Sequence, residues 1–131
     1  MTRLLIVAAG GALGAVARYG VGAWATRLLP GAQWPWATLA VNVFGGLLMG
    51  LLAGWLGFRG GVHGEGLRLF AAVGVLGGFT TFSAFSLEAG LMIERRQLAM
   101  AGGYVAASVV LSIAALFLGL LVARRAFGAA L

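Results

Sequence analysis

Apolar residues form four long runs along the chain, and charged residues lie almost only between these runs, with Arg18 and Glu88 as the exceptions. The runs cover residues 4–24, 36–58, 69–92 and 98–122. A helix of about 20 residues, rising about 1.5 Å per residue, crosses a hydrocarbon core about 30 Å thick. The pattern therefore predicts an all-α membrane protein: a single transmembrane domain, residues 1–131, with four transmembrane helices.

The beginning of the chain allows a second interpretation. Arg3, the apolar stretch after it and the small residues 15–17 resemble a signal peptide with its cleavage site. However, four residues recur at intervals of four and stack on one helix face: Gly10, Gly14, Arg18 and Gly22. This spacing, and the three runs that follow, favour a helix that stays packed in the membrane.

Composition supports the membrane assignment. Hydrophobic residues make up 62% of the chain and charged residues only 9%, whereas soluble domains carry about 25% charged residues. The chain has no cysteine, and its one histidine, His63, lies in the glycine-rich loop predicted at 59–68. No pair of carboxylates falls within one run. These absences make an enzyme the least favoured class of protein.

Nine arginines against three glutamates give a formal net charge of +6. The arginines lie singly or in pairs near the ends of apolar runs, which suits lipid phosphates better than nucleic acid. With four spans, one side of the membrane would carry Arg3, Arg59, Arg68, Arg124 and Arg125. The other side would carry Arg27, Arg95 and Arg96, with or without Arg18. So small a bias permits insertion in both orientations and antiparallel pairing, although a single orientation with a weak signal stays open.

The second run carries a stripe of small residues that begins with an amide. Its members are four residues apart: Asn42, Gly46, Gly50 and Gly54. Small residues at this spacing allow another helix backbone to come close. The Asn42 side chain should therefore face a protein partner or a cavity, and a single interhelical hydrogen bond is the simpler alternative.

The fourth run carries hydroxyl groups at the same spacing, on Tyr104, Ser108 and Ser112. A serine in a membrane helix often bonds back to its own backbone. Three hydroxyls on one face favour a polar track instead.

The third run contains the string GGFTTFSAFS at residues 77–86. Gly77 and Gly78 are poor helix formers, and either Thr80 or Thr81 could restart a helix as its N-cap. The run therefore predicts two half-helices with a break near 77–81. Free backbone groups at that depth are tolerated only inside protein or along a cavity, and bare carbonyls suit a small cation.

These stretches resemble the CrcB or Fluc family of small fluoride channels. The resemblance covers most of the chain, from GALGAVARYG through WPWATLAVNVFGG and GGFTTFSAFSLE to the Tyr-Ser-Ser track. It implies a four-span subunit with a broken third helix that forms an antiparallel, dual-topology homodimer in the cell inner (plasma) membrane. The implied function is passive, fluoride-selective export that relieves fluoride toxicity.

The resemblance also implies roles for particular residues. Phe82 and Phe85 would line the pore, with their ring edges toward fluoride. The other implied pore residues are Asn42, Thr81, Tyr104, Ser108 and Ser112. Gly77 and Thr80 would lend backbone carbonyls to a structural sodium ion at the centre of the dimer interface. Arg18 matches an arginine near the end of the first helix, and Glu88 matches a carboxylate near a pore mouth.

Elementary chemistry agrees with an anion pathway. Fluoride is small and strongly hydrated, so a pore must replace its water with hydrogen-bond donors and the electropositive edges of aromatic rings. The third run has no acidic residue before Glu88. A small multidrug exporter would need a glutamate in the first run, which has Arg18 and no acid. A non-conducting accessory subunit would leave the hydroxyl-rich break unexplained.

Overall fold

The computed structural model describes residues 1–59 and 64–128. His63 and the centre of the loop predicted at 59–68 lie outside these described residues. Every regular element within them is helical. In chain order the elements are α1 (Thr2–Leu28), α2 (Trp36–Phe58), α3 (Gly64–Leu67), η1 (Arg68–Leu76), α4 (Gly77–Phe79), α5 (Phe82–Glu94) and α6 (Leu98–Gly128).

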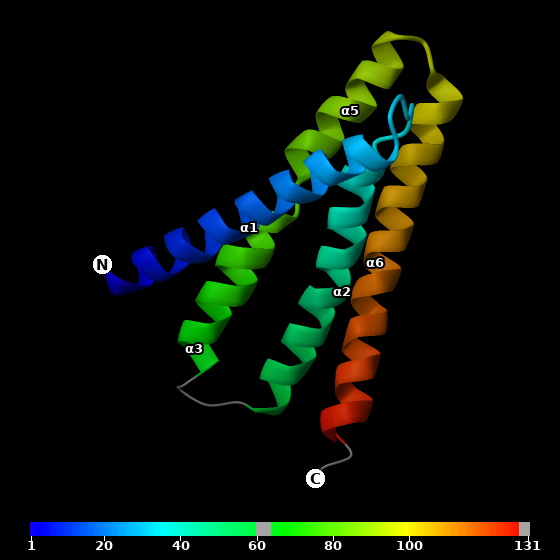
Figure 1. Ribbon diagram of the computed structural model, residues 1–131. Helices are drawn as coiled ribbons and strands as arrows, with labels where there is room; N and C mark the ends of the chain where they lie inside the picture. The colour runs from blue at the N-terminus through cyan, green and yellow to red at the C-terminus, as the bar shows by residue number, and fades with distance from the viewer. Residues whose placement is uncertain (60–63, 129–131) are drawn as a thin grey trace.

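Four helical stretches among the described residues are long and apolar enough to cross a membrane: Thr2–Leu28, Trp36–Phe58, Gly64–Glu94 and Leu98–Gly128. The third of them comprises α3, η1, α4 and α5. The predicted class, an all-α protein with four membrane-spanning helices, is confirmed. Figure 1 shows α2 and α6 lying side by side, while α1 crosses the third stretch obliquely.

Glycines without side chains bring α2 against α6. A Cβ atom added at Gly46 would lie 2.7 Å from the Ser112 carbonyl oxygen, and one at Gly50 would lie 2.9 Å from the Leu116 carbonyl carbon. Gly119 on α6 is equally close to α2, since its Cβ would lie 2.7 Å from the Leu51 nitrogen. The predicted close approach along the glycine stripe is therefore confirmed, and the partner helix is α6 of the same chain.

The glycine face of α1 packs in part. A Cβ at Gly10 would lie 3.0 Å from the Gly74 Cα in η1, and one at Gly14 would lie 2.8 Å from the Phe79 nitrogen in α4. A Cβ at Gly22 would meet nothing within 4 Å. The packed face thus includes Gly10 and Gly14, whereas a side chain at Gly22 would have open space within this chain.

The helical path changes twice within the third stretch. η1 is a π-helix, with a wider turn than the α-helix that follows it. Thr80 (φ −75°, ψ 158°) and Thr81 (φ −151°, ψ 118°) are then both extended, between α4 and α5. Thr81 is the N-cap of α5, because its Oγ1 accepts a hydrogen bond from the Ala84 backbone N–H at 3.1 Å.

The two glycines of the GGFTT string are helical, contrary to what their low helix propensity suggests. Gly77 and Gly78 belong to α4, and the extended residues begin at Thr80. Gly78 instead serves packing, because a Cβ there would lie 3.1 Å from the Gly11 Cα in α1. The close approach of α1 therefore explains why a glycine stands at this position.

The buried core lies where α2, α5 and α6 meet. Its members are Leu39, Phe85, Ala89, Met92, Ala101 and Tyr104. Many other large apolar side chains are exposed along all the long helices. Such surfaces are expected of a chain whose surroundings are lipid or another apolar protein face.

Candidate functional site

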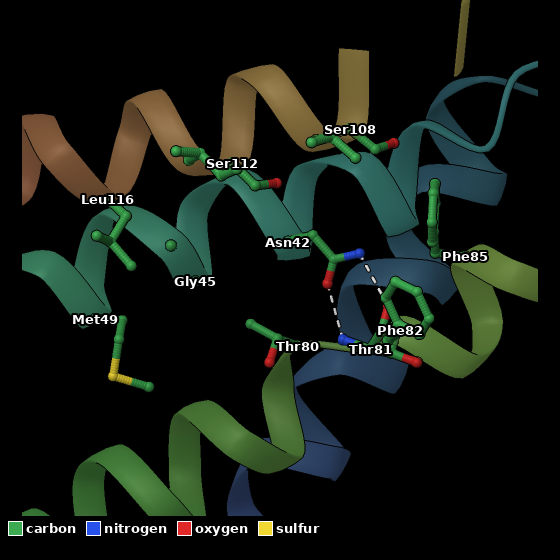
Figure 2. Close-up of a pocket in the computed structure, with 13 residues that line it drawn as sticks. Asn42, Gly45, Met49, Thr80, Thr81, Phe82, Phe85, Ser108, Ser112 and Leu116 are labelled. Carbon is green, nitrogen blue, oxygen red and sulfur yellow. Dashed lines mark hydrogen bonds between the residues drawn. The ribbon is translucent and has the colours of Figure 1, made fainter. Parts of the chain in front are cut away.

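A cavity of about 410 Å³ lies between α2, the Thr80–Thr81 segment, α5 and α6 (Figure 2). Six of the seven residues predicted for the pore line it: Asn42, Thr81, Phe82, Phe85, Ser108 and Ser112. Thr80 also lines it, together with apolar residues that include Met49, Ile113 and Leu116. The folded chain therefore brings together residues that lie on three different helical stretches.

Two serine hydroxyls on α6 have no partner beside this cavity. The Oγ atoms of Ser108 and Ser112 are buried and make no hydrogen bond to any described residue. Elsewhere hydroxyls do bond back to their own helix, since Ser86 Oγ donates to the Phe82 carbonyl at 2.8 Å and Thr26 Oγ1 donates to the Gly22 carbonyl at 3.0 Å. Because an unpaired buried hydroxyl costs free energy, a further hydrogen-bond partner at these two hydroxyls would be stabilising.

The Asn42 side chain joins α2 to the extended segment. Its Oδ1 accepts a hydrogen bond from the Thr81 N–H at 2.8 Å, and its Nδ2 donates to the Thr81 carbonyl at 2.9 Å (Figure 2). Asn42 also lines the cavity. Asn42 therefore makes bonds between helical stretches, two in place of the single bond of the simpler alternative, and it also faces the cavity.

The two phenylalanines of α5 lie next to each other at the cavity. The centroids of the Phe82 and Phe85 rings are 5.4 Å apart, and their planes are tilted by 51°. Phe85 is buried, whereas Phe82 is 78% exposed in the single chain. One ring is thus fixed by the core, and the other is open to a further partner.

Tyr104 does not line the cavity. It is fully buried, and its hydroxyl donates to Glu88 Oε2 at 2.6 Å. The hydroxyl of Thr38 donates to Glu88 Oε1 at 2.7 Å. The structure therefore places Tyr104 behind the cavity lining and pairs its hydroxyl with a carboxylate.

Thr38 is a residue that the sequence analysis missed. It lies four residues before Asn42, on the same stripe as Gly46 and Gly50. Extending that stripe by one turn toward the N-terminus would have found it. A lone threonine at the start of an apolar run gives no other signal.

Two backbone carbonyls beside the extended segment lose the donors that a continuous helix would supply. The Thr81 N–H, which would bond to the Gly77 carbonyl, bonds to Asn42 instead. The Ala84 N–H, which would bond to the Thr80 carbonyl, bonds to Thr81 Oγ1 instead. Hard oxygen atoms of this kind fit a small cation. Among the described residues no group of three or more His, Cys, Asp or Glu side chains could hold a metal ion.

Arg18 is half-buried on α1, and it does not line the cavity. Its Nε atom is buried and has no hydrogen-bond partner among the described residues. The structure thus gives no bonded role to the arginine that the resemblance singles out.

The chain is similar along nearly its whole length to proteins of known name. Residues 5–120 match a family described as CrcB-like protein, Camphor Resistance (CrcB). A protein of Caulobacter sp. (strain K31) named Fluoride-specific ion channel FluC is 64% identical over 97% of this chain and 98% of its own length. Proteins of the same name from Caulobacter vibrioides (strain NA1000 / CB15N) and Agrobacterium fabrum (strain C58 / ATCC 33970) are 60% and 50% identical, over 97% of this chain and 99% and 100% of their own lengths.

Proposed function

This chain belongs to the CrcB-like family, and on that premise we propose that it is a passive, fluoride-selective ion channel. It lies in the cell inner (plasma) membrane as a multi-pass protein and lets fluoride leave the cell down its gradient, which relieves fluoride toxicity. It is a channel and not an enzyme. The observation that carries this proposal is one cavity lined by two phenylalanine rings and by two serines whose hydroxyls have no hydrogen-bond partner among the described residues.

The chemistry of this cavity fits a small, strongly hydrated anion. The hydroxyls of Ser108 and Ser112 have hydrogens to donate, and the edges of the Phe82 and Phe85 rings are electropositive. No carboxylate is among the residues that line the cavity. A row of several binding sites of modest affinity lets an ion both enter and leave the pore. Thr81 belongs to the same lining and presents its side-chain oxygen as the cap of α5.

Glu88 lies one turn beyond Phe85 on α5, where both of its carboxylate oxygens are occupied by hydroxyl donors. We place it near a mouth of the pathway, with Tyr104 and Thr38 holding it in place. The role of Arg18 stays a prediction. Its positive charge would favour an anion, but its contacts give no further support for a place in the pathway.

Two features support an antiparallel homodimer with dual topology. The arginines divide almost evenly between the two sides of the membrane, and Phe82 is 78% exposed although it lines the cavity. A second copy would cover Phe82 and complete the wall of each pore. A structural sodium ion would be held at the centre of the dimer by the carbonyls of Gly77 and Thr80, which lack their helical donors, with each copy contributing a pair.

Purified protein in liposomes should release trapped fluoride and retain chloride. The physical reason is that the hydroxyl donors and ring edges of the cavity replace water best around the smaller, more charge-dense halide. A fluoride electrode measures the release, with protein-free liposomes as the control. A chloride or potassium current in place of fluoride release would overturn the proposed function.

Removing either unpaired hydroxyl should slow release. A hydrogen bond to a charged group is worth about 1.5–3 kcal/mol, and each 1.4 kcal/mol is about tenfold in rate. Ser108→Ala and Ser112→Ala should therefore each slow fluoride efflux roughly tenfold or more. The matched control is Thr26→Val on α1, which removes a hydroxyl that is already bonded to its own helix. Equal rates in all three variants would contradict a role for the serine pair.

A further inference from the structure

The extended segment raises a physical problem that its neighbours must solve. Backbone N–H and C=O groups that leave a helix inside a membrane have no water to bond with. Thr81 is only 8% exposed, so its peptide groups are buried. Asn42 satisfies both groups of this one residue, with bonds of 2.8 Å and 2.9 Å.

This pairing is possible only while Thr81 is extended. In an extended residue the N–H and the C=O point to the same side of the chain, as they do in paired β-strands. One planar amide can then accept from the N–H and donate to the C=O. In an α-helix the N–H and C=O of a residue point in opposite directions along the axis. The Asn42 amide therefore interacts differently with the extended and the helical form, which is the condition for shifting an equilibrium between them.

The backbone of α2 lies close enough to support this contact. Gly45 is buried, and a Cβ atom there would overlap Cγ2 of Thr80. Val41, next to Asn42, is only 2% exposed. Asn42 thus projects from a tightly packed part of the α2 backbone that lies beside Thr80.

We propose that Asn42 is a positioning residue that holds the third stretch open at Thr80–Thr81. Its two bonds keep the Thr81 N–H away from the Gly77 carbonyl and set the direction in which α5 starts, with Phe82 as its first residue. Only one amide hydrogen of Asn42 is then left for an ion. The inference rests on the proposed fluoride channel for its consequence in conduction, and on the hydrogen bonds alone for its structural part.

The test combines two measurements on the full-length protein: fluoride efflux, and hydrogen exchange of the Thr81 amide measured by NMR. Asn42→Ala should slow efflux, and it should speed exchange of the Thr81 amide by about tenfold or more, because the bond that protects this amide is lost. The matched variant Ser112→Ala should slow efflux and leave Thr81 exchange unchanged, because Ser112 makes no bond to Thr81.

The possible outcomes separate this inference from the proposed function. Slow efflux with unchanged Thr81 exchange in Asn42→Ala would overturn the positioning role and leave Asn42 as a direct ion ligand. Faster exchange with normal efflux would show that the pairing does not serve conduction. A wild-type protein that conducts no fluoride would overturn the proposed function but not the pairing.

A second variant keeps the test decisive if Asn42→Ala does not fold. Asn42→Asp retains an oxygen that can accept from the Thr81 N–H but replaces the amide donor. Thr81 exchange in this variant should stay within about threefold of the wild type, while efflux falls because the Thr81 carbonyl has lost its donor and a carboxylate at the cavity repels fluoride. Unprotected Thr81 exchange in the wild type itself would overturn the inference without any variant.

Discussion

Replacing Phe82 with isoleucine should strongly slow fluoride release from liposomes while leaving the oligomeric state intact. The Phe82 ring lies 5.4 Å from the Phe85 ring at the cavity, and only an aromatic ring presents an electropositive edge to an anion. Isoleucine keeps the apolar bulk but removes that edge. If the contact with the ion is worth about 1.5–3 kcal/mol, as for bonds to charged groups, efflux should fall by roughly 10- to 150-fold.

The matched control for this substitution is Phe117→Ile. Phe117 is on α6, is 59% exposed and does not line the cavity, so its replacement should leave efflux unchanged. Size-exclusion chromatography reports whether each variant keeps the oligomeric state of the parent. A Phe82→Ile protein that conducts as fast as the parent would show that the ring is not part of the pore.

The second large effect concerns folding. Gly50→Val should destabilise the protein by about 3 kcal/mol or more, because overpacking a tight contact costs about 1–3 kcal/mol and occasionally more. A Cβ atom at Gly50 would lie 2.9 Å from the Leu116 carbonyl carbon and 3.0 Å from the Leu120 nitrogen. These are backbone atoms of α6, so neither helix can relieve the overlap by rotating a side chain.

Gly57→Val provides the control within the same helix. A Cβ at Gly57 would meet nothing within 4 Å, so this variant carries the change in helix propensity without the overlap. The thermal midpoint of unfolding in detergent compares the two variants. Similar midpoints would mean that helix propensity, and not the contact between α2 and α6, sets the cost of a side chain on this stripe.

Periodicity predicted the helices well because lipid imposes length and apolarity on every spanning segment. It also predicted that Gly46 and Gly50 meet another backbone. It did not predict that α6 is the partner, since a stripe of small residues fits any helix. Propensity misjudged Gly77 and Gly78, because the helix continues through both glycines, and the close approach of the α1 backbone accounts for a glycine at Gly78.

The candidate site was predicted where residues lie on one helix and less well where several helices meet. Ser108 and Ser112 are one turn apart and line one cavity. Tyr104 has the same spacing, yet its hydroxyl bonds to Glu88 on α5. A spacing of four residues states which residues share a face but not which neighbour each side chain will bond. Only the packing of α5 against α6 decides that.

The pairing of Asn42 with Thr81 also bears on how the chain is made. Asn42 precedes Thr81 by 39 residues, and a chain is synthesised from its N-terminus. The second helix therefore emerges from the ribosome before the interrupted one. When Thr81 enters the bilayer, the amide that shields its peptide groups from hydrocarbon is already there. A circular permutation that placed residues 64–95 ahead of residues 36–59 would reverse that order and should lower the yield of inserted protein.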